Sequence, residues 1–359
     1  MKFGVRHRIF AQPLECLLDK VKLECGQARA EKKKRGETYS SGSTFFIGGQ
    51  EEPSCLLEQL AKEIWAFHAA GSGGGGGVEW WTQVIDTRDD IGYHFDRDYD
   101  LEDHAGIHVY PSLASVTYLT TPTAVASSGA TLVLNCRGTS SRGEALSPIV
   151  DNFIISRPQV GKHFYFDGHL LHAAPSSIEG EDEEVEEGAD TEDDDDDESD
   201  GEGELRVTFL ANVWINHIPK HACRFPASLA SKLSPPIAGP LLDLVSPAGT
   251  ESEVPVQLTM QRPSDVLARS TWHFKDASHT FRVTLPRPLG LDVDASASTI
   301  HVLCEGTETS GTVEDLGECS EEEEEEEEKE EEEEEGEEEK EEEEEEGEGG
   351  ERRAKRCRR

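Results

Sequence analysis

The chain has 359 residues, of which 76 are acidic and 34 are basic, and its formal net charge is −42 at neutral pH. Two blocks, residues 179–204 and 321–351, hold 43 of the 76 acids, so the remainder of the chain is close to neutral. The acidic balance argues against a broad nucleic-acid-binding face, and no apolar run approaches the roughly 18 residues that a membrane helix needs.

The first part of the chain, residues 1–43, lacks a sustained apolar period, and we expect a poorly ordered lead-in there. Its basic run, residues 32–35, is interpreted as a solvated charge run, with a nuclear signal as the alternative. No apolar segment near the start is long enough for a secretory signal, and the eight cysteines include no CxxC pair. We therefore expect reduced thiols and a cytoplasmic or nuclear location.

The first expected helix covers residues 53–70. Apolar residues recur there at helical spacing, Pro53 suits a first helical turn, and Gly71 suits the position after the last turn. The glycine-rich stretch that follows contains the pattern GxGxxG. A phosphate-binding loop is not expected from it, because such a loop follows a strand rather than a helix.

From residue 78 onward the pattern is that of β-strands separated by turn-rich segments. No helical pattern lies between successive strands, which argues against a parallel βαβ sheet. We expect a mainly β fold with flanking helices, of the α+β class, in which an antiparallel sandwich or barrel forms the core. The clearest strands are expected over residues 78–86, 109–120, 130–135, 163–167 and 205–215.

Four further segments complete the expected organisation. The acidic run 179–204 cannot bury apolar surface and is expected to be a disordered insertion between two strands. Residues 227–250, rich in Pro and Ser, are expected to form a linker. Weaker strand patterns in residues 251–305 indicate either a small β extension or additional strands of the main sheet. Residues 306–359 are expected to be a disordered Glu-rich tail with a basic end, because its like charges repel one another.

A candidate metal site comes from two distant segments. His94 and Asp96 are two residues apart in an expected strand, so their imidazole and carboxylate lie on the same face. Downstream, His169 and His172 are the candidates for a third ligand. Two histidines and one carboxylate on one side of a metal leave positions open for oxygen and a co-substrate, which suits Fe(II). The alternative for His94 and Asp96 is a hydrogen-bonded pair without a metal.

A candidate anion site lies in the strand expected over residues 205–215. Apolar residues surround Arg206, and strand alternation places Thr208 on the same face. A guanidinium beside a hydroxyl suits the carboxylate end of an anionic co-substrate. The alternatives are an ordinary salt bridge for Arg206 and an ordinary strand threonine for Thr208.

The order of these parts resembles the Fe(II)/2-oxoglutarate-dependent dioxygenases, and among them the prolyl 4-hydroxylase-like branch. His94 and Asp96 match the HxD motif of that family. His172, which a proline follows three residues later, matches its distal histidine, and Arg206 lies in the strand that comes next. The resemblance covers residues 44–219, about half of the chain.

The resemblance implies a double-stranded β-helix (jelly-roll) core within residues 44–226. It implies that His94, Asp96 and His172 hold Fe(II), with His172 preferred over His169, and that no catalytic side chain is needed beyond these ligands. Arg206 lies 34 residues after His172, whereas about ten residues separate the corresponding positions in the family. The acidic insertion accounts for the difference, because long surface loops cost little closure entropy.

The resemblance also implies 2-oxoglutarate and O2 as co-substrates, with ascorbate in support. Arg206, Thr208 and Tyr118 would hold the far carboxylate of 2-oxoglutarate, and a hydroxylation would release succinate and CO2. For Tyr118, a place in the hydrophobic core is the alternative.

The sequence does not specify the substrate. Prolyl residues of a protein are the expectation that the family suggests, and the acidic blocks favour a basic protein partner, without direct nucleic-acid or membrane contact. Two other functions stay open: a catalytically inactive jelly-roll that serves as a binding scaffold, and an acidic protein that binds basic partners.

Overall fold

The computed structural model describes residues 1–10, 19–27, 44–70, 75–86, 89–121, 129–142, 144–177, 205–244, 255–276, 279–289, 291 and 297–318. The expected acidic insertion and the Glu-rich part of the expected tail lie outside these residues. The described residues are mainly β-strand with few helices, which confirms the expected mainly β fold. In this part of the chain, no helix is long and apolar enough to cross a membrane. The described residues divide into two compact units, of which the larger lies within residues 1–274 and 282–314 and the smaller includes residues 275–276, 279–281 and 315–318.

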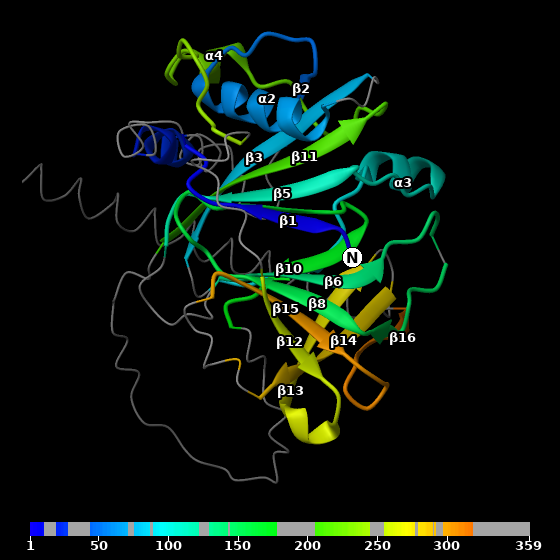
Figure 1. Ribbon diagram of the computed structural model, residues 1–359. Coiled ribbons are helices and arrows are strands. Elements are labelled where there is room, and N and C mark those ends of the chain that lie inside the picture. The colour runs from blue at the N-terminus through cyan, green and yellow to red at the C-terminus, as the bar shows by residue number, and fades with distance from the viewer. Residues whose placement is uncertain are drawn as a thin grey trace, which may run out of the picture. The chain divides into compact units, whose positions relative to one another are not determined.

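The first sheet has the strand order β1-β9-β5-β11-β3-β2, and all neighbours in it are antiparallel (Figure 1). Strand β11 pairs along its whole length with β3 and also with β5, so it lies near the middle of the sheet. The strands are β1 (Phe3–Arg6), β2 (Phe45–Gly48), β3 (Gly76–Asp86), β5 (Leu113–Tyr118), β9 (His163–Phe166) and β11 (Leu205–Ile215).

The second sheet has the strand order β12-β15-β8-β6-β10-β4. Its neighbours are antiparallel except for β12 and β15, which are parallel. The strands are β4 (Ile91–His94), β6 (Thr131–Arg137), β8 (Asn152–Ser156), β10 (Leu170–Ala174), β12 (Val256–Met260) and β15 (Thr299–Cys304).

The chain passes back and forth between the two sheets. Strands β3, β5, β9 and β11 belong to the first sheet, and β4, β6, β8 and β10, which lie between them in sequence, belong to the second. The sheets face each other, because Val116 and Phe164 of the first share one buried cluster with Val133, Ile154 and Leu170 of the second (Figure 1). This alternation around a common apolar layer is consistent with a jelly-roll.

Helix α2 (Leu56–His68) covers the outer face of the first sheet (Figure 1). Leu60 and Ile64 of the helix are fully buried in one cluster with Trp80 and Phe209 of the sheet. The expected helix over residues 53–70 is thus present with shorter ends.

Two short helices that follow α2 in the chain were not expected from the sequence. Helix α3 (Tyr99–Ala105) lies between β4 and β5, where no helical pattern is visible, because it is only seven residues long and mostly polar. Helix α4 (Ala227–Ala230) lies in the segment expected to be a linker.

The ends of the chain contain more regular structure than expected. Within the expected lead-in, β1 pairs with β9, and residues 19–27 are helical. In the expected extension over residues 251–305, β12 and β15 join the second sheet, so these two strands extend the main sheet. The other strands form a sheet of order β13-β14-β16-β7, with β7 (Ile149–Val150), β13 (Val266–Asp276), β14 (His279–Pro288) and β16 (Gly311–Glu318), and a 3-10 helix precedes β13 (Pro263–Asp265).

Candidate functional site

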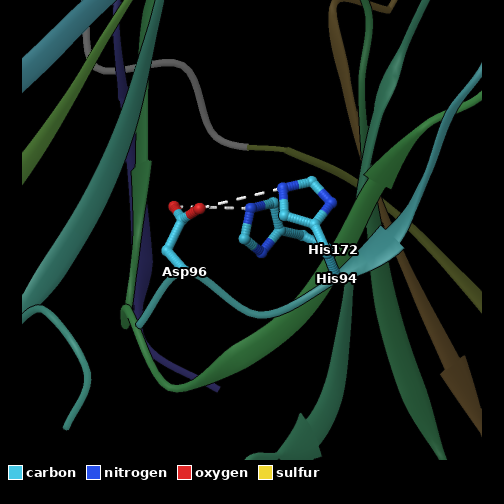
Figure 2. Close-up of side chains that lie close together, drawn as sticks. All are labelled: His94, Asp96 and His172. Carbon is cyan, nitrogen blue, oxygen red and sulfur yellow. Dashed lines mark ion pairs between the residues drawn. The ribbon is translucent and has the colours of Figure 1, made fainter. Parts of the chain in front are cut away.

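Adjacent strands of the second sheet bring two histidines together. His94 is the last residue of β4 and His172 is the middle residue of β10, and the two are directly paired in the antiparallel register. Residues paired in this way have their side chains on the same face, and the two imidazole ring centroids lie 4.4 Å apart. Asp96 follows β4 by two residues and returns toward the same point, as Figure 2 shows.

The potential ligand atoms of His94, Asp96 and His172 all lie within 4.8 Å of one another. The Nε2 atom of His94 lies 3.7 Å from one carboxylate oxygen of Asp96, and the Nε2 atom of His172 lies 3.5 Å from the other. Both gaps exceed the 2.7–3.2 Å of an ordinary N–H···O hydrogen bond. They have the size expected when one metal ion is to bind all three side chains, so this donor set fits a divalent transition metal.

The orientation of both rings is fixed by the strands that carry them. Nδ1 of His94 donates a hydrogen bond to the carbonyl oxygen of Gly92 at 2.8 Å, and Nδ1 of His172 donates to that of Leu170 at 2.9 Å. Because the carbonyls can only accept, each Nδ1 carries a proton, and Nε2 is the nitrogen of each ring that faces Asp96 and is placed to bind a metal. A backbone partner on the far nitrogen is typical of metal-binding histidines.

Burial differs between the three side chains. His172 is buried, and burial lowers the pKa of its imidazole to about 4. The negative charge of Asp96 raises this pKa and the neighbouring His94 lowers it, but burial has the largest effect. The ring is therefore neutral near pH 7, which is the form that binds a metal. The side chain of His94 is 36% exposed and that of Asp96 is 13% exposed, so the cluster opens to solvent on the His94 side.

The other candidate histidines lie elsewhere. Nδ1 of His169 lies 3.0 Å from a carboxylate oxygen of Asp167, and His169 does not belong to the cluster. A further histidine near the cluster in sequence, His108 in the segment between α3 and β5, pairs with Glu102 at 3.1 Å. Between His169 and His172, the structure therefore places the latter beside His94 and Asp96.

Arg206 and Thr208 lie on β11 with their side chains directed between the sheets, on the same face as Leu210, which packs against the inner apolar cluster. Arg206 is 2% exposed, and its Nη1 donates a hydrogen bond of 2.6 Å to the carbonyl oxygen of Gly129. Burial lowers the pKa of Arg206, which nevertheless stays protonated at neutral pH.

Two polar atoms of this pair are buried without a hydrogen-bond partner: Nε of Arg206 and Oγ1 of Thr208. An unpaired buried polar atom costs about 1–3 kcal/mol, so native structures seldom leave one unsatisfied. A donor on a guanidinium and a neighbouring hydroxyl are together suited to a bound carboxylate. The pair therefore fits an anionic ligand held between the sheets.

Tyr118 lies opposite Thr208 in the register of β5 and β11 and is completely buried. Burial raises the pKa of its hydroxyl, which donates to Oγ1 of Thr131 at 2.8 Å and lies 3.0 Å from the carbonyl oxygen of Ser156. The hydroxyl already has protein partners, so its contact with a co-substrate carboxylate stays a prediction.

Sequence reasoning missed Lys162, the residue before β9. It is completely buried, its ammonium donates to the carbonyl oxygen of Arg157 at 3.0 Å, and it lies 5.6 Å from the centre of the Tyr118 ring. A lysine next to a turn is usually exposed, so nothing in the sequence indicates this burial. Its amino group is thus a second basic group near Tyr118, besides that of Arg206.

No family model matches this sequence, and no curated protein is similar to it by sequence. The solved structures that are similar in fold include three with low TM-scores. A prolyl-4-hydroxylase from Pseudomonas putida has 12% identity and a TM-score of 0.34 over 60% of this chain and 87% of its own. The non-heme alpha ketoglutarate dependent carbocyclase SnoK from nogalamycin biosynthesis has 12% identity and a TM-score of 0.34, and the match covers 68% of this chain and 92% of SnoK. EctD from S. alaskensis has 13% identity and a TM-score of 0.32, and the match covers 67% of this chain and 84% of EctD.

Proposed function

We propose that this chain is an Fe(II)- and 2-oxoglutarate-dependent dioxygenase built on a double-stranded β-helix core. The observation that carries the proposal is the convergence of His94, Asp96 and His172 from separate segments of the chain. Two imidazoles and one carboxylate leave adjacent coordination positions open, which suits non-heme Fe(II). The alternation of the chain between two facing sheets supports the proposed core.

In this proposal His94, Asp96 and His172 hold the iron. Iron and 2-oxoglutarate, when bound together, supply the activation of O2 and the release of succinate and CO2. The protein contributes Nε2 donors whose direction is set by the backbone bonds of the opposite ring nitrogens. It also contributes a buried position for His172, which keeps that ring unprotonated at neutral pH.

Arg206 and Thr208 orient 2-oxoglutarate in this account. A carboxylate placed between them would give partners to the unpaired Nε of Arg206 and the unpaired Oγ1 of Thr208. Their position between the sheets excludes water, which strengthens a charge-assisted hydrogen bond. We propose that Tyr118 completes this site and that Lys162 contributes through its charge.

We propose a protein substrate, with prolyl residues as the first to be tested. The support for a basic polypeptide is the charge of the chain, because the two acidic blocks attract positively charged partners over long distances. The more exposed side of the metal site, next to His94, is where a side chain of the substrate would approach.

The test uses the full chain, purified anaerobically and supplied with Fe(II), ascorbate, 2-oxoglutarate and O2. Wild-type protein is expected to release succinate slowly even without substrate, and His94→Ala is expected to lose this release because only two ligands remain. His169→Ala is the matched control, since its imidazole lies outside the cluster, and it should keep wild-type turnover. A wild-type chain that binds neither Fe(II) nor 2-oxoglutarate would refute the proposal.

A further inference from the structure

Asp98 lies two residues after Asp96, at the end of the segment that leads into α3. Its carboxylate is completely buried and caps the helix, with Oδ1 accepting a hydrogen bond of 3.2 Å from the backbone N–H of Leu101. Its own backbone N–H donates to the carbonyl oxygen of Val109 at 2.9 Å. Asp98 is therefore anchored through both its main chain and its side chain.

The other carboxylate oxygen of Asp98 connects this segment to the residues that follow β11. Oδ2 accepts a hydrogen bond of 2.8 Å from Nε2 of His217 and another of 3.1 Å from the backbone N–H of Lys220. His221 approaches the same carboxylate, with its Nδ1 3.7 Å from Oδ1. One buried carboxylate thus joins the segment after β4, the start of α3 and the segment after β11.

Arg97, between Asp96 and Asp98, is fixed as well. Its side chain is 5% exposed, and its Nε lies 2.5 Å from a carboxylate oxygen of Glu102, which also pairs with His108. On the other side of Asp96, His94 is held by the register of β4 with β10. The short segment that carries Asp96 is therefore fastened at both ends.

We propose that Asp98 is a positioning residue for the metal centre: through His217, Lys220 and the start of α3 it holds Asp96 facing His94 and His172. The inference rests on the proposed function, because it assigns Asp98 a role toward the iron ligands. A ligand set must be held within about 0.5 Å of its productive geometry. Groups that support metal ligands in this way typically change metal affinity by about 10- to 100-fold when they are replaced.

Asp98→Asn tests this role with little change in shape. Asparagine keeps one oxygen and is a good helix cap, so the bond to Leu101 can remain. Its amide NH2 then stands where Oδ2 accepts from His217 and Lys220, and an NH2 group cannot accept these hydrogen bonds. With the amide turned the other way, the oxygen keeps the bonds from His217 and Lys220 and the cap at Leu101 is lost. In either orientation the variant cannot join the start of α3 and the segment after β11 at the same time, as the carboxylate does.

Glu63→Gln is the matched control. The Glu63 carboxylate on α2 also accepts two backbone N–H bonds, from Leu241 at 2.9 Å and Leu242 at 2.7 Å. It belongs to the outer face of the first sheet rather than to the segment that carries Asp96. Its replacement is expected to lower thermal stability in the same manner as Asp98→Asn, without affecting the metal ligands.

The measurement is anaerobic titration of each full-length protein with Fe(II), alongside its thermal unfolding. Asp98→Asn is expected to raise the Kd for Fe(II) about 10- to 100-fold, while Glu63→Gln keeps the wild-type value. His217→Ala, which removes one of the donors and leaves Lys220 and Leu101 bonded, is expected to raise the Kd by a smaller factor. This second variant keeps the test decisive if Asp98→Asn does not fold.

The outcomes separate the inference from the proposed function. If the wild-type chain binds Fe(II) and both Asp98→Asn and His217→Ala bind it equally well, the positioning role is refuted while the metal centre stands. An equal loss of affinity in Glu63→Gln would also refute it, because the effect would then follow from lower stability alone. A wild-type chain without affinity for Fe(II) would overturn the proposed function, and the inference with it.

Discussion

At the scale of single residues, the two histidines of the proposed metal site use the same local contact. Each donates its Nδ1 proton to the carbonyl oxygen two residues earlier in its own strand, Gly92 for His94 and Leu170 for His172. The contact is intrinsic to each strand and fixes the tautomer before any metal is bound. The sequence indicates that these are histidines in strands but not which ring nitrogen is free, because that depends on backbone geometry.

The proposed role of Arg206 leads to a prediction about 2-oxoglutarate. Arg206→Ala is expected to raise the KM for 2-oxoglutarate about 10- to 100-fold, since hydrogen bonds to charged groups contribute about 1.5–3 kcal/mol. Arg206→Lys should recover part of the loss, because it restores the charge without the planar fork. Succinate release at varied 2-oxoglutarate measures the effect.

The control for this prediction is Arg137→Ala, which removes an exposed arginine paired with Asp167 at 2.7 Å. It should leave the KM for 2-oxoglutarate unchanged. An unaltered KM in Arg206→Ala would show that the co-substrate carboxylate binds elsewhere.

At the scale of elements, the pairing of β10 with β4 brings together the two histidines of the proposed metal site. The spacing of His94 and Asp96 predicts that they share a face, whereas the proximity of His172 depends on a strand pairing between residues far apart in sequence. The resemblance to a family favours His172 over His169 as the third ligand, whereas the sequence pattern alone does not distinguish between the two histidines. Helix α3 could not be predicted, because seven mostly polar residues show no apolar period.

The segment after β11 is held to β3 and α3 by His221, which gives a pH-dependent contribution to stability. Its Nε2 lies 2.8 Å from a carboxylate oxygen of Glu79, and Asp98 lies on its other side. Burial lowers the pKa of His221, but the hydrogen bond and charge of Glu79, together with the charge of Asp98, outweigh burial and raise it. Because the folded-state pKa exceeds the unfolded value of about 6.5, the contribution is complete below that pH and is lost as pH rises through the folded-state pKa.

We therefore expect His221→Gln to lower the Tm most at mildly acidic pH, with a difference from wild type that shrinks as the pH is raised. Thermal unfolding of both proteins between about pH 5.5 and 8.5 measures this difference. His279→Gln removes a more exposed histidine–carboxylate pair with Asp315 in the smaller unit, and its effect on Tm should be small at every pH. If the difference in Tm between His221→Gln and wild type grew as the pH is raised, the protonated form of His221 would not be the stabilising one, and the prediction would be wrong.

At the scale of the whole molecule, a mainly β chain could be anticipated because several segments rich in aromatic and β-branched residues are separated by turns, with no helical pattern between them. The division of these strands between two sheets could not be anticipated, since strand pairing over long separations is not encoded in local pattern. Strand β1 is a similar case: its four residues are too short to show a period, and its place is set by pairing with β9.

The polar atoms between the sheets that lack a hydrogen-bond partner could likewise not be predicted from the sequence. The sequence predicts that Arg206 and Thr208 share a face, but only the packed structure shows that Nε and Oγ1 lack partners. The buried charge of Lys162 is a further case, because a lysine beside a turn gives no sign of burial. These features arise from the way the two sheets close over one another.

The most direct test is an X-ray structure of crystals soaked anaerobically with Fe(II), with anomalous data collected on both sides of the iron absorption edge. The account predicts one iron peak within about 2.0–2.2 Å of Nε2 of His94, Nε2 of His172 and a carboxylate oxygen of Asp96, the distances usual for first-row metal–imidazole and metal–carboxylate bonds. A strong iron peak held by other residues, or no iron at these three side chains in crystals saturated with Fe(II), would contradict it.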